Sequence, residues 1–220
     1  KRIISIVGGR SASMYAKDTT YLLAKKLAKS GFVIASGGAL GIDTKAHEGA
    51  YPNTIAIFAN SLDITYPNTN RVFIEKIYKD SLALSEKECD YSPARYDFVL
   101  RNRLTVALGE VLIVSEANID SGSMKSAQYA LESGKKIYVL PHRINESGGT
   151  NLLLKTNKAE PIYDIDEFIA SLGGEIKQED DDEILEFCKT SPFFNEGLNR
   201  FGEKIYEYEL DGKITIKDGR

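Results

Sequence analysis

The stretch VIASGGALGIDTKAHEGA, Val33–Ala50, changes its hydrophobic periodicity at two adjacent glycines, Gly37 and Gly38. An uninterrupted apolar run of strand length precedes the glycines, and Ile42–Ala50 after them carries its apolar residues at helical spacing. Glycine permits the tight turn that joins a buried strand to a helix. The stretch therefore predicts one strand–turn–helix unit of an α/β sheet.

The same unit repeats along most of the chain. Strand-like apolar runs are RIISIVGG (Arg2–Gly9), TIAIFA (Thr54–Ala59), LALSE (Leu82–Glu86), EVLIVSEA (Glu110–Ala117) and KIYVLP (Lys136–Pro141). Helical patterns lie between them at Met14–Gly31, Asn70–Asp80, Arg101–Leu108 and Ser123–Gly134. Strands that are apolar on both faces and alternate with helices form parallel sheets covered on both sides. We therefore predict an α/β fold with a doubly wound, mostly parallel sheet.

The composition changes near the C-terminus, where LGGEIKQEDDDE, Leu172–Glu183, is polar and charged in the manner of a linker. We predict a sheet domain over residues 1–172, an acidic linker over 173–183 and a small domain over 184–220. In the last of these, short helical patterns precede Ile214 and Ile216, which alternate with polar residues between Asp-Gly turns and so indicate a β-hairpin. Helices followed by a hairpin predict a winged-helix-like domain.

The formal charge of −4 is unevenly distributed. From Glu179 onward, twelve acidic and six basic residues give −6, which leaves 22 basic and 20 acidic residues, or +2, before it. A local basic cleft is compatible with this balance, whereas a general basic coat is not. The two cysteines, Cys89 and Cys188, lie far apart, which argues against a disulfide framework and favours a reducing, cytoplasmic location. We expect no membrane partner, because no apolar run is long enough to span a bilayer.

Four predicted strand ends carry small or glycine-rich turns. These turns are Gly8–Ser11, Ser36–Ala39, Ser121–Ser123 and Gly148–Asn151. Ligands of open α/β sheets bind at the carboxyl ends of strands, and free N–H groups at a helix start attract anions. A single turn of this kind is as often only a tight connection between a strand and a helix as it is a ligand site. Several such loops along one sheet edge suit a string of phosphates better than the single pyrophosphate of a dinucleotide.

A phenylalanine lies among arginines in PARYDFVLRNR, Pro93–Arg103, just before a predicted buried strand. Single-stranded nucleic acid is held by cations along its backbone and by aromatic rings that stack on its bases. Arg10 and Arg95 are the best phosphate ligands of the chain, because guanidinium is a planar fork of donors. Phe98 would stack on bases or, in the structural alternative, pack under the following helix. Asn102 would bind a phosphate or a base edge, or cap its helix.

Several polar residues have the chemistry of catalysis without its context. Asp43 and His47 lie four residues apart, on one face of the predicted helix, and we favour a structural hydrogen bond between them over base catalysis. Glu86 and Glu116 follow predicted strands, but nothing indicates that they converge. SGGALGID departs from the GxGxxG dinucleotide pattern, so a nicotinamide dehydrogenase is a minor alternative. We predict no metal site, because ligands at readable spacing are lacking.

Taken in order, these segments resemble the DNA-processing protein A (DprA/Smf) family. The resemblance is carried by IVGGRSASMYA, VIASGGALGIDTKAHEGA, TIAIFANSLDITYPNTN, LSE, RNRLTVAL, LIVSEANIDSGSMKSA and GGTNLLL, which cover most of Ile3–Ile162. It implies an extended Rossmann-like domain that binds single-stranded DNA, forms homodimers and helps to load the RecA recombinase during natural transformation. It implies no catalytic activity and no cofactor.

Carried over by position, the resemblance implies a DNA site made of residues from several turns. They are Arg10 of the G-x-R turn, the phosphate loop Ser36, Gly37 and Gly38, Arg95 and Phe98 before RNR, Asn102 within it, and the SGS turn Ser121, Gly122 and Ser123. Ser61 and His142 stand where the family usually has glycine. The alternative is an enzyme, a nucleotide-processing hydrolase of the lysine-decarboxylase-like phosphoribohydrolase type, whose glycine-rich motif SGGALGIDTKAHE matches only in part.

Overall fold

The computed structural model describes residues 1–175, 183–188 and 192–217. The chain divides into two compact units, Lys1–Ile176 and Lys177–Arg220. No helix among the residues that the model describes is both long enough and apolar enough to cross a membrane.

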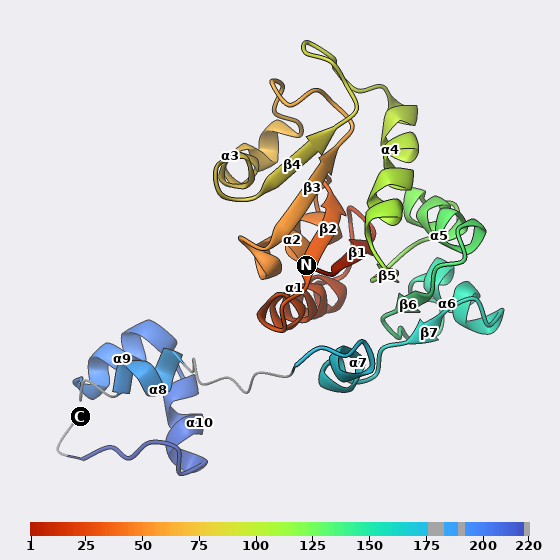
Figure 1. Ribbon diagram of the computed structural model, residues 1–220. Coiled ribbons are helices and arrows are strands. Elements are labelled where there is room, and N and C mark those ends of the chain that lie inside the picture. The colour runs from red at the N-terminus through yellow and green to blue at the C-terminus, as the bar shows by residue number, and fades with distance from the viewer. Residues whose placement is uncertain (176–182, 189–191, 218–220) are drawn as a thin grey trace. The chain divides into compact units, whose positions relative to one another are not determined.

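The first unit is built on a seven-stranded parallel sheet (Figure 1). Its strands are β1 (Ile3–Val7), β2 (Val33–Gly37), β3 (Thr54–Phe58), β4 (Leu82–Ser85), β5 (Val111–Val114), β6 (Ile137–Val139) and β7 (Glu160–Pro161). They lie in the order β4-β3-β2-β1-β5-β6-β7, and every neighbouring pair is parallel. The predicted α/β class and the doubly wound parallel sheet are therefore confirmed.

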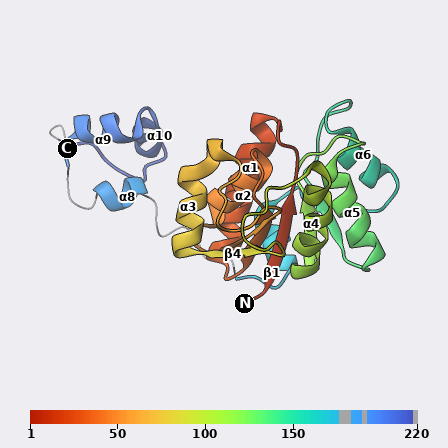
Figure 2. The ribbon, with the colours of Figure 1, turned by 90° about the horizontal axis from the view of Figure 1, so that it is seen from above.

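Helices cover both faces of the sheet, as the view from above shows (Figure 2). One face carries α1 (Met14–Lys29), α2 (Ile42–Ala50), α3 (Arg71–Asp80) and α7 (Ile165–Ser171); the other carries α4 (Arg95–Leu108), α5 (Gly122–Glu132) and α6 (Gly148–Lys155). A short 3₁₀ turn, η1 (Asn68–Asn70), precedes α3.

The strands are apolar on both faces because each face is packed under helices. In β1, the fully buried Ile4 and Ile6 join the core beneath α1, α2 and α7, whereas Val7 joins the core beneath α4, α5 and α6. Side chains of a strand alternate between its faces, so a strand covered on both sides needs apolar residues throughout. This explains why the apolar runs of the sequence located six of the seven strands; β7, two residues long with an exposed Glu160, has no such run and was not predicted.

The strand order reverses direction at β1. The chain runs outward through β2, β3 and β4 on one side of β1, and it then returns to place β5, β6 and β7 on the other. The loops that leave the carboxyl ends of β1 and β5 therefore diverge, and they leave a crevice between them. This topological switch point is where an open α/β sheet accommodates a ligand.

The described residues of the second unit form three short helices, α8 (Glu183–Cys188), α9 (Phe194–Phe201) and α10 (Lys204–Leu210). Aromatic pairs join them, with the ring centroids of Phe187 and Phe201 5.3 Å apart and those of Phe194 and Tyr206 also 5.3 Å apart. The predicted helices are present. Residues 213–217 form no strand, and the Asp-Gly turn that would close the predicted hairpin lies outside the described residues, so the winged helix stays a prediction.

Candidate nucleic-acid interface

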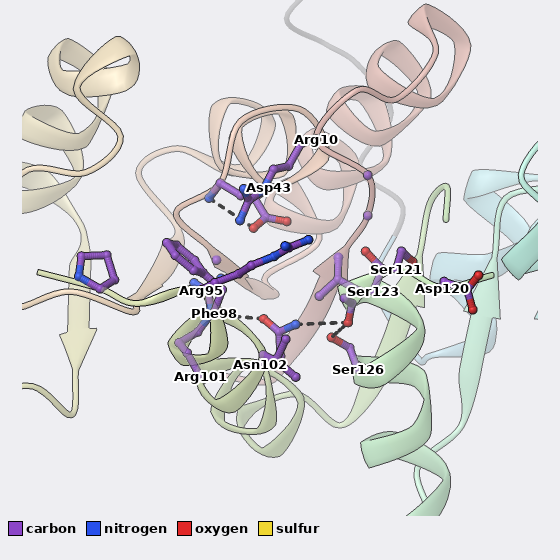
Figure 3. Close-up of a pocket in the computed structure, with 18 of the residues that line it drawn as sticks. Arg10, Asp43, Arg95, Phe98, Arg101, Asn102, Asp120, Ser121, Ser123 and Ser126 are labelled. Atoms are coloured by element: carbon purple, nitrogen blue, oxygen red, sulfur yellow. Dashed lines mark hydrogen bonds between the residues drawn. The ribbon is translucent and has the colours of Figure 1, made fainter. Parts of the chain in front are cut away.

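A pocket of about 660 Å³ lies at the switch point of the sheet (Figure 3). Its walls come from the turn after β1, the end of β2, the first turns of α4 and the start of α5. Eight of the ten residues that the sequence assigned to a DNA site line it: Arg10, Gly37, Arg95, Phe98, Asn102, Ser121, Gly122 and Ser123. Segments more than a hundred residues apart in the chain thus meet at one cavity.

Arg10 and Phe98 form a contact across this pocket. The guanidinium carbon of Arg10 lies 5.1 Å from the centroid of the Phe98 ring, a cation–π arrangement. Tyr66, on the loop after β3, packs against the same ring at a centroid distance of 5.7 Å. Phe98 is half-buried rather than sealed in the core, so part of its ring faces the cavity.

The position of Arg10 depends on a glycine that the sequence did not single out. Gly41 begins α2 with a φ of 83°, in the left-handed region that favours glycine. A β-carbon at this residue would collide with the backbone carbonyls of Gly9 and Arg10. Because Gly41 has none, the start of α2 packs directly against the turn that carries Arg10.

The first turn of α5 forms the opposite wall of the pocket. The hydroxyl of Ser121 caps the helix by accepting a hydrogen bond from the Met124 N–H at 3.4 Å. The side-chain amide of Asn102 donates to the Gly122 carbonyl at 3.2 Å, which ties α4 to α5 (Figure 3). The first N–H groups of a helix have no partner within the helix, so this wall presents hydrogen-bond donors to a ligand.

The predicted phosphate loop after β2 requires a correction. Ser36 is fully buried, and its hydroxyl donates to the Ile6 carbonyl at 2.6 Å, so its side chain supports the sheet instead of facing the pocket. Gly38 packs against the ring of Phe58 and does not line the cavity. Of Ser36, Gly37 and Gly38, only Gly37 lines the pocket, together with the following Ala39. A β-carbon at Gly37 would collide with side-chain atoms of both Arg101 and Asp43.

The floor of the pocket holds two charged groups that the sequence did not assign to the site. Arg101 and Asp43 are 7% and 6% exposed, respectively, and both line the cavity. One terminal nitrogen of Arg101 donates to the Ile57 carbonyl, and its Nε lies 3.3 Å from the amide oxygen of Asn102. Burial raises the pKa of Asp43 to about 6, although the nearby charge of Arg101 opposes that rise.

The favoured hydrogen bond between Asp43 and His47 is wrong. The two residues brace the same turn separately: Asp43 accepts from the Ala39 N–H at 3.3 Å, and His47 lies 2.7 Å from the Gly37 carbonyl through Nε2. A carbonyl only accepts, so Nε2 carries the hydrogen. Nδ1 lies 2.6 Å from the Thr54 hydroxyl, which itself donates to the Ile34 carbonyl at 2.9 Å. Burial lowers the pKa of His47 to about 4.

The other polar residues named from the sequence have separate structural contacts. Glu86 pairs with Arg103 at 2.7 Å on the surface, whereas Glu116 accepts from the Ser13 hydroxyl at 2.6 Å at the start of α1. The two carboxylates therefore have different partners on different elements. His142 lies 2.8 Å from the Ser115 carbonyl through Nε2. Within the described ranges, no three His, Cys, Asp or Glu residues gather as a metal site would require.

Comparison with known proteins gives consistent matches over the first unit. The family model for DNA recombination-mediator protein A matches residues 1–173. Over 175 residues, the chain is 37% identical to Protein Smf of Synechocystis sp., an alignment that covers 77% of this chain and 44% of that protein. The chain thus spans about half the length of the curated relatives it matches.

Two solved structures share this fold. DNA processing protein A from Helicobacter pylori, whose structure describes a single-stranded DNA binding mode, has a TM-score of 0.76 and 46% identity, covering 78% of this chain and 80% of that one. DNA processing protein A from Streptococcus pneumoniae has a TM-score of 0.72 and 31% identity, covering 80% of this chain and 62% of that one.

Proposed function

We propose that this chain, which belongs to the DNA recombination-mediator protein A family, binds single-stranded DNA in the pocket at the switch point of its sheet. The proposal is supported by the single-stranded DNA binding described for the Helicobacter pylori relative, at 46% identity. It is supported independently by the charges of the pocket itself.

The observation that carries the proposal is an excess of unpaired guanidinium groups. Arg10, Arg95 and Arg101 line one cavity, and none of them makes an ion pair with a carboxylate of the described residues. In contrast, Arg103 on the same helix α4 is paired with Glu86. A concave site that holds more arginines than carboxylates favours an anionic ligand, and arginine forks match phosphate geometry.

The aromatic side of the pocket favours a nucleic acid over a simple anion. Phe98 and the 42% exposed Tyr66 give the cavity an apolar edge beside the cations. Bases that stack on such rings contribute about 1–3 kcal/mol each without regard to sequence. We assign the phosphates to Arg95 and the first turn of α5, and a base to the exposed part of the Phe98 ring.

We further propose that the protein acts without catalysis, as a homodimer in the cytoplasm, and that it helps RecA to assemble on single-stranded DNA during natural transformation. A mediator must hold DNA without cleaving it, and cations, rings and helix N-termini are sufficient for that task. The test is the rate at which RecA filaments form on single-stranded DNA, with and without this protein. No acceleration would refute the mediator role while leaving DNA binding intact.

The binding proposal is tested by titrating the protein with single-stranded and duplex oligonucleotides at several salt concentrations. We expect tighter binding to the single strand, and we expect Arg95→Ala to lower both the affinity and the salt slope, the slope by about one. Phe98→Ala should weaken binding by about 1–3 kcal/mol with the slope unchanged. The matched control is Arg103→Ala, which removes a paired arginine from the same helix and should change neither quantity.

The hydrolase alternative makes a different prediction. Such an enzyme would release free base from a nucleoside monophosphate, which chromatography detects directly. Asp43, which lies within its partial motif, is buried behind Gly37, and Glu86 is paired with Arg103 of the RNR segment. We therefore expect no base release, and its appearance would overturn the non-catalytic proposal.

A further inference from the structure

The floor of the pocket contains one buried carboxylate and one buried guanidinium whose pairing is incomplete. The side chains of Asp43 and Arg101 both lie next to the position that a β-carbon on Gly37 would occupy, and both line the cavity. Arg101 uses Nη1 for the Ile57 carbonyl and Nε for Asn102, and its remaining terminal nitrogen, Nη2, has no hydrogen-bond partner among the described residues. Nη2 is not among the buried side-chain atoms that lack a partner, and Arg101 lines the cavity, so this nitrogen is available to a ligand that enters the pocket.

We propose that a phosphate of bound single-stranded DNA competes with the Asp43 carboxylate for the Arg101 guanidinium, so that DNA binding is accompanied by uptake of one proton by Asp43. This inference rests on the proposed function and adds a regulatory property to the same pocket. The proton comes from the solvent, and no covalent bond forms or breaks. Asp43 thereby makes the affinity for DNA depend on pH.

Electrostatics gives the direction of this coupling. The groups that act on Asp43 are Arg101 from α4 and Arg10 from the turn after β1, both of which stabilise its charged form. A phosphate between these arginines neutralises them and adds a negative charge beside a buried carboxylate, so both changes favour the protonated acid. His47, one turn along α2, stays neutral in the same pH range because burial lowers its pKa to about 4.

The free protein is already poised for this proton uptake, since the pKa of Asp43 is raised to about 6. If binding raises that pKa further, affinity is highest below about pH 6 and falls as the pH rises from there to the pKa of the complex. Each unit of additional shift corresponds to about a tenfold loss of affinity across that range. Arg95 and Asp120, which also line the pocket, are exposed and therefore have a weaker influence.

The test measures binding of a fluorescently labelled oligothymidine at fixed ionic strength, from about pH 5.5 to about pH 8. We expect the affinity of the wild-type protein to fall roughly tenfold over this range. Asp43→Asn keeps the hydrogen-bond acceptor for Ala39 but removes the charge, so it should bind at pH 8 as tightly as the wild type at low pH. The matched control is Asp120→Asn, which removes the exposed carboxylate of the same pocket and should retain the slope.

Calorimetry of the wild-type protein gives a second readout that needs no variant. Binding measured near pH 7 in buffers of different ionisation enthalpy should show uptake of up to one proton. Tight binding without proton uptake, or an unchanged pH slope in Asp43→Asn, would overturn the inference and leave DNA binding intact. If the wild-type protein bound no oligothymidine at any pH, the proposed function and this inference would both fail.

Discussion

Two buried carboxylates of the first unit, Asp97 and Asp43, have pKa values that are shifted in opposite directions. Asp97 is 1% exposed and accepts from the Lys87 ammonium at 2.7 Å, the Tyr91 hydroxyl at 2.9 Å and the Ala94 N–H at 2.8 Å. These contacts, that of Lys87 above all, hold its pKa below the usual range. Asp43 is 6% exposed and has no ion pair within the described residues, and burial raises its pKa to about 6.

The difference shows that the charge of Asp97 has a structural role, whereas that of Asp43 is available to a ligand. The contacts of Asp97 close the loop before α4 and fix the start of that helix, so nothing is left for a ligand. Asp43 and Arg101 remain incompletely paired at the floor of a cavity. A buried charge that the fold does not satisfy costs stability, and such charges concentrate at functional sites.

The variant with the largest expected effect removes Asp97, the carboxylate whose hydrogen-bond partners are all supplied by the fold. Asp97→Ala deprives Lys87, Tyr91 and Ala94 of their common acceptor, and we expect the melting temperature to fall by roughly 10 to 15 °C. Differential scanning calorimetry at neutral pH measures the change. A shift of only a few degrees would mean that Asp97 is no better satisfied than Asp43, and the comparison would fail.

A second test uses the pH dependence of stability. Because the pKa of Asp43 is raised, its contribution to the free energy of unfolding is complete below about pH 4 and is lost as the pH rises to about 6. Because the pKa of His47 is lowered, its contribution is complete above about pH 6.5 and is lost as the pH falls to about 4. In the wild-type protein these two trends oppose each other. Asp43→Asn leaves only that of His47, so the free energy of unfolding should rise by about 3 kcal/mol from pH 4 to pH 6.5.

Urea unfolding at a series of pH values measures this profile. The wild-type protein serves as the reference, because its two opposing groups should give a nearly flat contribution over the same range. A profile of Asp43→Asn parallel to that of the wild type would show that Asp43 does not titrate as its burial requires.

The reciprocal variant, His47→Gln, sharpens the same comparison with a slightly smaller effect. Glutamine keeps a donor for the Gly37 carbonyl but does not titrate, so only the trend of Asp43 remains. We expect the free energy of unfolding to fall by just under 3 kcal/mol as the pH rises from about 4 to about 6. The same urea series detects it, and a rise in place of a fall would contradict the assignment.

The smallest expected effect is at the surface. Glu86→Gln breaks the exposed pair with Arg103, in which the side chains are 47% and 44% exposed, so solvent replaces most of the interaction. The melting temperature should change by less than about 3 °C. A loss comparable to that of Asp97→Ala would show that burial does not separate the two classes of carboxylate.

The sequence predicted β1 to β6 because these strands are apolar runs, a pattern that a parallel sheet covered on both faces requires, whereas the two-residue β7 with its exposed Glu160 was missed. It also singled out Arg10, Arg95 and Phe98, which the structure brings to one pocket, since arginines and an aromatic ring near glycine turns are an unusual local composition. It failed at Ser36, which resembles a phosphate ligand in the chain but donates to Ile6 inside the sheet. Local composition does not indicate which way a side chain at a strand end points.

The sequence alone determined the fold class, the glycine turns and the presence of cations near an aromatic ring, because these follow from periodicity and residue type over short stretches. The tertiary structure decided that Arg10 lies over Phe98, that Arg101 is buried beside Gly37 and that Asp43 faces a cavity instead of His47. The reason is physical. The charge state of a buried group depends on which distant segments desolvate and pair it, and only the packing of β1, α2 and α4 brings those segments together.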